Sequence, residues 1–94
     1  MNMQARFETT RESAVREAAV IGKILADLAR TVELIEADIA VEETCAGVFD
    51  PSDVRYPVLA MTLIERRDNL RKTMAALEAR HTERARHEQT ATAA

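Results

Sequence analysis

The sequence predicts an all-α protein, built as an antiparallel hairpin of two long, coiled-coil-like helices. Its 94 residues include only two glycines and two prolines, which leaves room for very few turns. Hydrophobic residues make up 47% of the chain and charged residues 31%, a balance typical of a folded chain. Apolar residues also recur at alternating spacings of four and three, the pattern of a helical seam. We expect one domain over residues 1–88, followed by a disordered tail at 89–94.

The first helix is predicted over about residues 4–46. Its apolar seam continues over almost four heptads and consists of Ala14, Ala18, Ile21, Leu25, Leu28, Val32, Ile35 and Ile39. We expect four further apolar residues to lie beside this seam and to widen the buried face, namely Val20, Ile24, Leu34 and Val41. Gly47 suits the left-handed backbone position that ends a helix.

The turn of the hairpin is predicted at about residues 47–56, because three of the four glycines and prolines lie between Gly47 and Pro57. Asp50 and Pro51 resemble the cap and the first residue of a helix, so we expect a short helical turn over residues 51–54. Phe49 and Tyr56 are expected to fold back and fill the end of the hairpin.

The second helix is predicted over about residues 57–87, since Pro57 lacks the amide that an uninterrupted helix needs. Its seam again alternates spacings of four and three, and consists of Tyr56, Ala60, Leu63, Arg67, Leu70, Met74, Leu77 and His81. Folding the chain at the turn places Ile39 beside Leu63 and Val32 beside Leu70.

The charges are distributed unevenly along the chain. Residues 31–53 contain seven acids and no base, whereas residues 54–86 contain eight bases and four acids. Acids near the C-terminal end of a helix oppose the helix dipole, so compensation from the second helix is expected. We predict that Glu33 and Glu36 pair across the hairpin with Arg66 and Arg67, and that Arg67 in the seam bonds to Glu36. Such pairs set the orientation of the helices more than they add stability.

A hairpin of two helices of about 60 and 45 Å has only one face to bury, so apolar strips of that length mark an interface. A symmetric homodimer, which makes a four-helix bundle, is the simplest way to cover them. The other way to cover these apolar strips is to pair with a different helical protein. The predicted interface residues are Ile21, Ile24, Leu25, Leu28, Val32, Ile35, Leu63, Leu70, Met74 and Leu77.

Few residues offer chemistry, because the chain has no glycine-rich phosphate loop, no cysteine cluster and no nucleophile elbow. We therefore expect no enzyme activity and no cofactor. One spacing is of interest: Glu78 and His81 lie three residues apart on one helical face. Dimeric four-helix bundles build di-iron sites from two such motifs and two further glutamates. A metal-binding, ferritin-like half-bundle is accordingly the alternative hypothesis, against a solvated glutamate and a histidine near a helix end.

A nucleic-acid partner is disfavoured, because the net charge is −3 and the basic run from Arg66 to Lys72 has no aromatic residues within it. Nucleic-acid binding through this run is kept as a third hypothesis.

The cytoplasm is the expected compartment, with no membrane partner. No apolar run approaches the roughly 20 residues of a membrane span, and the segment from Met1 to Glu12 is charged where a signal peptide is apolar. Cys45 is the single cysteine, so we interpret it as a small, partly buried apolar residue. The leading functional hypothesis is a non-enzymatic protein–protein interaction module, acting as a homodimer that serves as an adaptor, chaperone or assembly factor.

Overall fold

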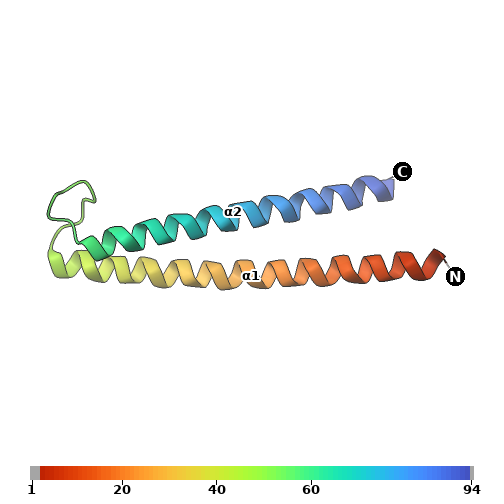
Figure 1. Cartoon of the computed structure of the whole chain (residues 1–94), viewed down its shortest axis with the longest axis horizontal. Helices are drawn as coiled ribbons and strands as arrows, with labels where there is room; N and C mark the ends of the chain where they lie inside the picture. The colour runs from red at the N-terminus through yellow and green to blue at the C-terminus, as the bar shows by residue number, and fades with distance from the viewer. Residues whose placement is uncertain (1–2, 94) are drawn as a thin grey trace.

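The computed structural model describes the backbone of residues 3–93 and the side chains of residues 10–86. Within that range it consists of two helices, α1 (Met3–Ala46) and α2 (Val58–Ala93), and contains no strand. The helices pack against each other as an antiparallel hairpin, with both chain ends at the same end of the rod (Figure 1). The molecule measures 68 × 20 × 15 Å. The all-helical, two-helix prediction is confirmed.

Helix α1 ends as its sequence predicts. Gly47 has a φ of 70°, the left-handed conformation that costs glycine little because it has no Cβ. Its amide donates a hydrogen bond to the carbonyl of Glu43 at 2.8 Å, so one of the last carbonyls of the helix is satisfied.

The loop differs from the predicted helical turn. Residues 51–54 form no helix; instead, two successive tight turns are closed by the Asp53 amide on the Asp50 carbonyl and by the Tyr56 amide on the Asp53 carbonyl, both at 3.0 Å. Proline at position 57 prevents the first turn from growing into α2, because it supplies no amide. Helix α2 begins one residue later, and the Met61 amide donates to the Pro57 carbonyl at 3.1 Å.

The predicted tail is also helical where it is described. Helix α2 extends through Ala93, beyond the predicted end near residue 87. Ala94 lies outside the described residues. The physical reason is local: residues 58–93 contain no glycine or proline and are rich in alanine, glutamate and arginine, which favour helix without tertiary contacts.

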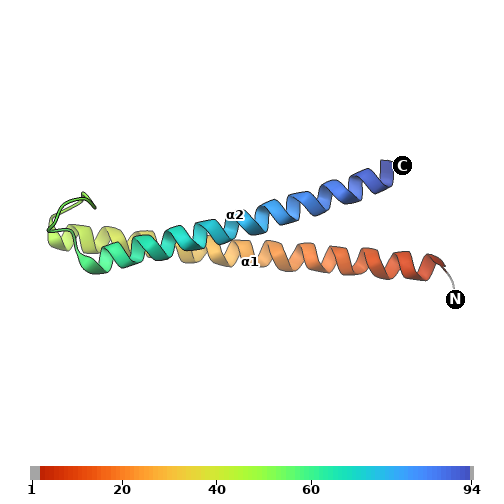
Figure 2. The same ribbon diagram turned by 45° about the horizontal axis from the view of Figure 1, so that its top comes forward.

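The hydrophobic core lies close to the loop. The buried apolar residues of the described side chains are Val32, Ile35, Ile39, Tyr56 and Ala60. The helices are closest at this end and diverge toward the chain ends in both ribbon views (Figures 1 and 2). Farther from the loop the seam offers alanines and a histidine in place of isoleucine and tyrosine, so less apolar area holds the helices together there. We call the loop end of the rod the closed end and the other the open end.

Candidate interaction surface

The residues predicted to form an interface lie mostly in the seam between α1 and α2. Val32 and Ile35 are buried there, with 8% and 5% of their surface exposed. Ile24 is 41% exposed. The other seven are half-buried: Ile21, Leu25, Leu28, Leu63, Leu70, Met74 and Leu77. The hairpin therefore uses these residues for its own packing and leaves most of them partly open to a further contact.

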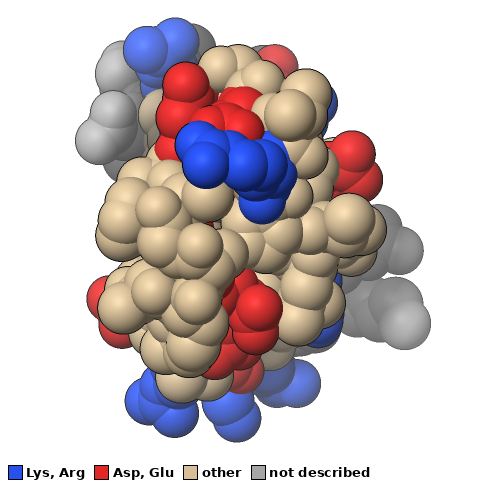
Figure 3. Space-filling model, turned by 90° about the vertical axis from the view of Figure 1, so that its left-hand side faces the viewer, with Lys and Arg blue, Asp and Glu red and all other residues tan. Residues whose placement is uncertain are grey.

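A first group of exposed apolar side chains lies at the closed end. Val54 is fully exposed, and Val58 and Phe49 are exposed by 82% and 64%. Figure 3 looks at this end, where uncharged residues cover much of the surface and charged residues lie among them. The expectation that Phe49 fills the hairpin end is therefore wrong. Tyr56, which is 7% exposed, is the aromatic residue buried at that end.

A second group lies on α1. Val20, Leu34 and Val41 are exposed by 57%, 62% and 58%, so they do not widen the seam as expected. Leu34 follows the buried Val32 by two residues, and two residues turn a helix by about 200°. The three side chains therefore lie on the side of α1 that faces away from α2. We call this side, over residues 16–45, the outer face.

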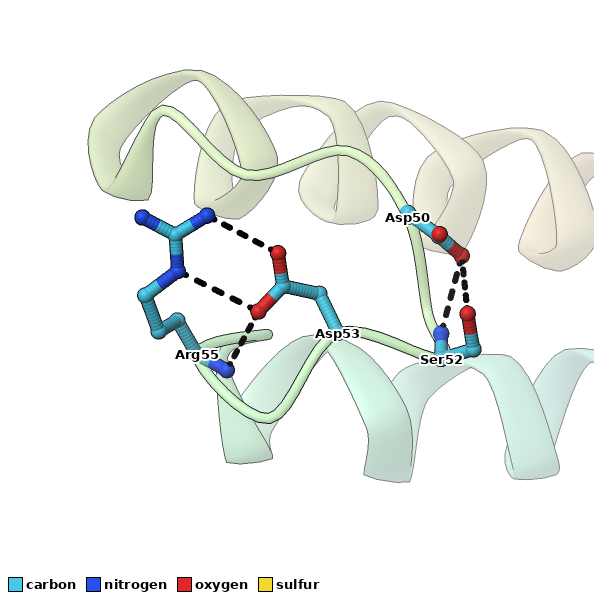
Figure 4. A network of polar contacts seen from close by, with 4 residues as sticks. All are labelled: Asp50, Ser52, Asp53 and Arg55. Atoms are coloured by element: carbon cyan, nitrogen blue, oxygen red, sulfur yellow. Dashed lines mark hydrogen bonds and ion pairs between the residues drawn. The ribbon is translucent and has the colours of Figure 1, made fainter.

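The loop is held by two aspartates that bind backbone and side-chain groups ahead of them (Figure 4). Asp50 accepts hydrogen bonds from the amide and the hydroxyl of Ser52, at 3.0 and 2.8 Å. Asp53 accepts from the Arg55 amide at 2.8 Å and from its guanidinium at 3.2 and 2.9 Å. These local bonds define the path of the loop, and the exposed Val54 lies between the two residues of the second pair.

The same bonds stabilise the ionised form of both carboxyl groups. The Ser52 amide, followed by the Ser52 hydroxyl, lowers the pKa of Asp50 below its ordinary value. The Arg55 side chain, followed by the Arg55 amide, lowers the pKa of Asp53. Both carboxylates are therefore charged and hydrogen-bonded at neutral pH, which favours a single loop conformation.

Tyr56 connects the loop to α1. Its hydroxyl donates a hydrogen bond to Oε2 of Glu43 at 3.0 Å. Burial of the ring raises the pKa of the Tyr56 hydroxyl, and the bond to the Glu43 carboxylate raises it further. Sequence reasoning did not find this pair, although a lone tyrosine just beyond the turn and an acid just before it are the signal.

The charge pairing across the hairpin differs from the prediction at two residues. Glu36 forms its ion pair with Arg71, one helical turn beyond the predicted Arg67. Arg67 pairs with its chain neighbour Asp68 at 3.2 Å. The guanidinium of Arg71 reaches Glu36 because a long side chain spans about one turn, a freedom that backbone register does not capture.

The other predicted members of this pairing, Glu33 and Arg66, are exposed and take part in no hydrogen bond or ion pair given for the described residues. A second cross-helix ion pair joins Glu17 and Arg84 near the open end. Folding the chain about residue 51 places these two side by side, so the predicted register holds there.

The metal-site candidates are not assembled within one chain. Glu78 is exposed, and His81 is half-buried in a shallow hollow against Ala14, Ala18 and Ile21 of α1. No group of three or more histidine, cysteine, aspartate or glutamate side chains that could hold a metal ion occurs among the described residues. A single hairpin therefore does not build the set of carboxylates and imidazoles that a di-iron bundle requires.

Cys45 is exposed and free, which corrects its interpretation as a partly buried residue. It lies on the outer face of α1, four residues beyond Val41.

Neither helix, over the residues described, combines the length and the apolar content that crossing a membrane requires.

Compared with protein-family models, curated proteins and solved structures, this chain has no match.

Proposed function

We propose that this protein is a non-enzymatic helical hairpin that acts as a homodimer and binds another protein, in the role of an adaptor, chaperone or assembly factor. The observation that carries the proposal is the balance between buried and exposed apolar side chains. Ten large apolar side chains are at least 40% exposed in the described part of the chain, against five buried residues of which one is an alanine.

A core of this size supports a dimer on energetic grounds. Burying a large apolar side chain contributes about 1.5–3 kcal/mol, while ordering each backbone residue costs about 1–2 kcal/mol. Small folds with so little interior usually gain stability from disulfides, metals or association. The chain has a single cysteine, so it has no disulfide of its own, which favours association.

The closed end supports the second part of the proposal, binding to another protein. Phe49, Val54 and Val58 are apolar, exposed and held on or beside a hydrogen-bonded loop. A surface that is already ordered loses little conformational entropy when a partner binds it. The cytoplasm is the compartment we propose, because an exposed free thiol such as Cys45 stays reduced there.

Sedimentation equilibrium over a range of concentrations tests the homodimer. We expect a species of twice the 10.5 kDa chain mass, with a melting temperature that rises with protein concentration. A stably folded monomer at micromolar concentration contradicts the proposal.

Affinity capture from the native host tests the binding of a second protein. A variant with Phe49→Ser and Val54→Ser should fold and dimerise like the wild type, because both side chains are exposed. It should lose proteins that the wild type retains. A double substitution of Ser13 and Thr82 to alanine, at exposed positions on the helices, serves as the matched control. Identical capture by all three proteins would argue against the closed end as the binding surface.

A further inference from the structure

The closed end presents exposed apolar side chains on or beside its loop. Val54, Val58 and Phe49 are exposed by 100%, 82% and 64%. Phe49 and Val54 belong to the loop itself, whose path is fixed by the hydrogen bonds that Asp50 and Asp53 accept from the residues ahead of them. Exposed apolar surface on an ordered segment is typical of a site that binds a partner.

The same end of the rod has a strong excess of acidic residues. Residues 38–65 comprise the last turns of α1, the loop and the first turns of α2, and they contain six acids and one base, a formal charge of −5. The acids are Asp38, Glu42, Glu43, Asp50, Asp53 and Glu65. The base, Arg55, is bound to Asp53 in an ion pair at 2.9 Å. Figure 3 shows acidic side chains on several sides of the uncharged surface of this end.

The acidic excess does not depend on where the closed end is taken to stop. Counting outward to residues 33–72 adds four bases and three acids, including the ion pair of Glu36 with Arg71, and leaves a charge of −4. The whole chain has a net charge of −3, so the rest of the sequence is slightly basic. The C-terminal end of α1 and the N-terminal end of α2 meet here, so their helix dipoles offset each other. The closed end is therefore the negative end of the molecule.

A surface that is both apolar and negative restricts the class of partner. It repels nucleic acids and the anionic lipids of membrane surfaces. It also disfavours a two-fold contact between two closed ends, because that contact would bring two acidic segments together. A protein segment that combines apolar and basic side chains complements both properties of the surface.

We propose that the closed end binds a basic amphipathic segment of another protein. Apolar side chains of that segment contact Phe49, Val54 and Val58, and its lysines or arginines face the surrounding acids. This inference rests on the proposed binding of a second protein and specifies the chemistry of that protein. The apolar contacts supply affinity, while the charges speed association and select against acidic segments. Added salt should weaken the complex, because it screens charges at the surface.

Peptide binding to the full chain tests this chemistry. The probe is a fluorescein-labelled peptide of leucine and lysine, about 18 residues long and patterned as an amphipathic helix. One comparison peptide has glutamate in place of lysine, and the other has serine in place of leucine. Fluorescence anisotropy should show the leucine–lysine peptide binding at least about tenfold more tightly than either comparison peptide. Equal binding of either comparison peptide would overturn the proposed partner chemistry.

A variant with Phe49→Ser and Val54→Ser tests the apolar contacts. Both side chains are exposed, so circular dichroism should show unchanged helix content. Binding of the leucine–lysine peptide should weaken by about tenfold or more, since two apolar contacts are lost. Unchanged peptide binding would overturn the closed end as the binding site.

A second variant, with Asp50→Asn and Glu65→Gln, tests the charges. Asparagine at position 50 retains an oxygen that can accept the Ser52 hydrogen bonds, so the loop should keep its path. The peptide should bind about threefold to tenfold more weakly, because two nearby acids are neutralised. Glu78→Gln with Glu83→Gln is the matched control. It changes the net charge equally at exposed positions of α2 far from the loop, and it should leave the affinity within about twofold. Equal losses in the two variants would overturn a local role for the acids.

Two further measurements address other occupants of the closed end. Vesicles of phosphatidylcholine with phosphatidylserine test a membrane, and sedimentation of the Phe49→Ser, Val54→Ser variant tests a second copy of the chain. Vesicle binding by the wild type without peptide binding, or loss of self-association in the variant, would overturn the proposal.

Affinity capture from the host separates failure of this inference from failure of the proposed function. Proteins retained by the wild type but not by the Phe49→Ser, Val54→Ser variant should elute as salt is raised toward about 1 M. Retention that persists at that salt concentration would contradict the basic partner and leave the proposed protein binding intact. Identical capture by the wild type and the variant would contradict both.

Discussion

Tyr56 joins the loop, the core and α1. Its ring is buried at the closed end, and its hydroxyl is bound by the Glu43 carboxylate. Both features favour the neutral phenol in the folded protein and raise the pKa of Tyr56 above the ordinary value. The stability of the folded protein therefore depends on whether the Tyr56 hydroxyl carries its proton.

This linkage predicts a loss of stability at alkaline pH. The stabilisation from Tyr56 is fully present below the ordinary pKa of 10.0 and is lost as the pH rises through the raised pKa of the folded state. The urea midpoint of the wild type should therefore fall more steeply above pH 10 than that of Tyr56→Phe. Near-ultraviolet absorbance reports the titration directly, because the chain has one tyrosine and no tryptophan.

Glu43→Gln is the control for this experiment. It should lower the raised pKa only in part, since burial is the larger cause and remains. A Tyr56 that titrates at its ordinary pKa would contradict the buried, hydrogen-bonded position.

The two glycines offer a matched pair of substitutions with opposite signs. Gly47→Ala should destabilise the hairpin by about 1–2 kcal/mol, because an L side chain at a φ of 70° is strained. Gly22→Ala should stabilise it by about 0.5–1 kcal/mol, because position 22 is inside α1 and an added Cβ has no atom of the neighbouring structure within 4 Å. Urea denaturation measures the change in unfolding free energy for both variants. If Gly47→Ala stabilised the protein as Gly22→Ala is expected to, the left-handed end of α1 at Gly47 would be contradicted.

At the scale of the elements, the relation between α1 and α2 rests on a few cross-helix contacts. Glu36 with Arg71 and Glu17 with Arg84 join the helices at two levels of the rod. All four side chains are substantially exposed, so each pair is screened by solvent. Their role is to select one register of the two helices.

A double-mutant cycle tests the partner of Glu36. Reversing Glu36 to Arg should cost up to about 1 kcal/mol, and adding Arg71→Glu should recover part of that loss. Arg67→Glu is the control. Because Arg67 pairs with Asp68, this substitution should recover less of the stability lost in the Glu36→Arg variant. Rescue by position 67 and not by position 71 would support the pairing predicted from the sequence over that in the structure.

At the scale of the whole molecule, we expect folding and the proposed association to depend on the same seam. Leu28 is half-buried in the seam, midway along α1. Leu28→Asp places an unpaired charge in the seam, so it should reduce both the helix content and the dimer fraction. Circular dichroism and sedimentation measure the two. A variant that stays folded and dimeric would show that the seam is wrongly assigned.

The seam and the end of α1 were predictable because they depend on local rules. Val32, Ile35 and Ile39 follow heptad spacing and are buried, and Gly47 adopts the left-handed conformation expected after α1. The outer face was misjudged although its signal was present. Leu34 and Val41 are seven residues apart and each lies two residues from a seam residue, a spacing that points to the opposite side of the helix.

The sequence alone determines two antiparallel helices and one turn. Helical periodicity and the positions of glycine and proline are enough to predict them, because each depends on backbone preferences over a few residues. The ring that fills the closed end and the arginine that reaches Glu36 depend on how the two helices rotate and pack against each other. Both outcomes arise from contacts between residues far apart in the chain. Phe49 and Tyr56 are both aromatic, and Arg67 and Arg71 are both arginines on one side of α2, so only the packing of the helices and the reach of each side chain decide which of them makes the contact.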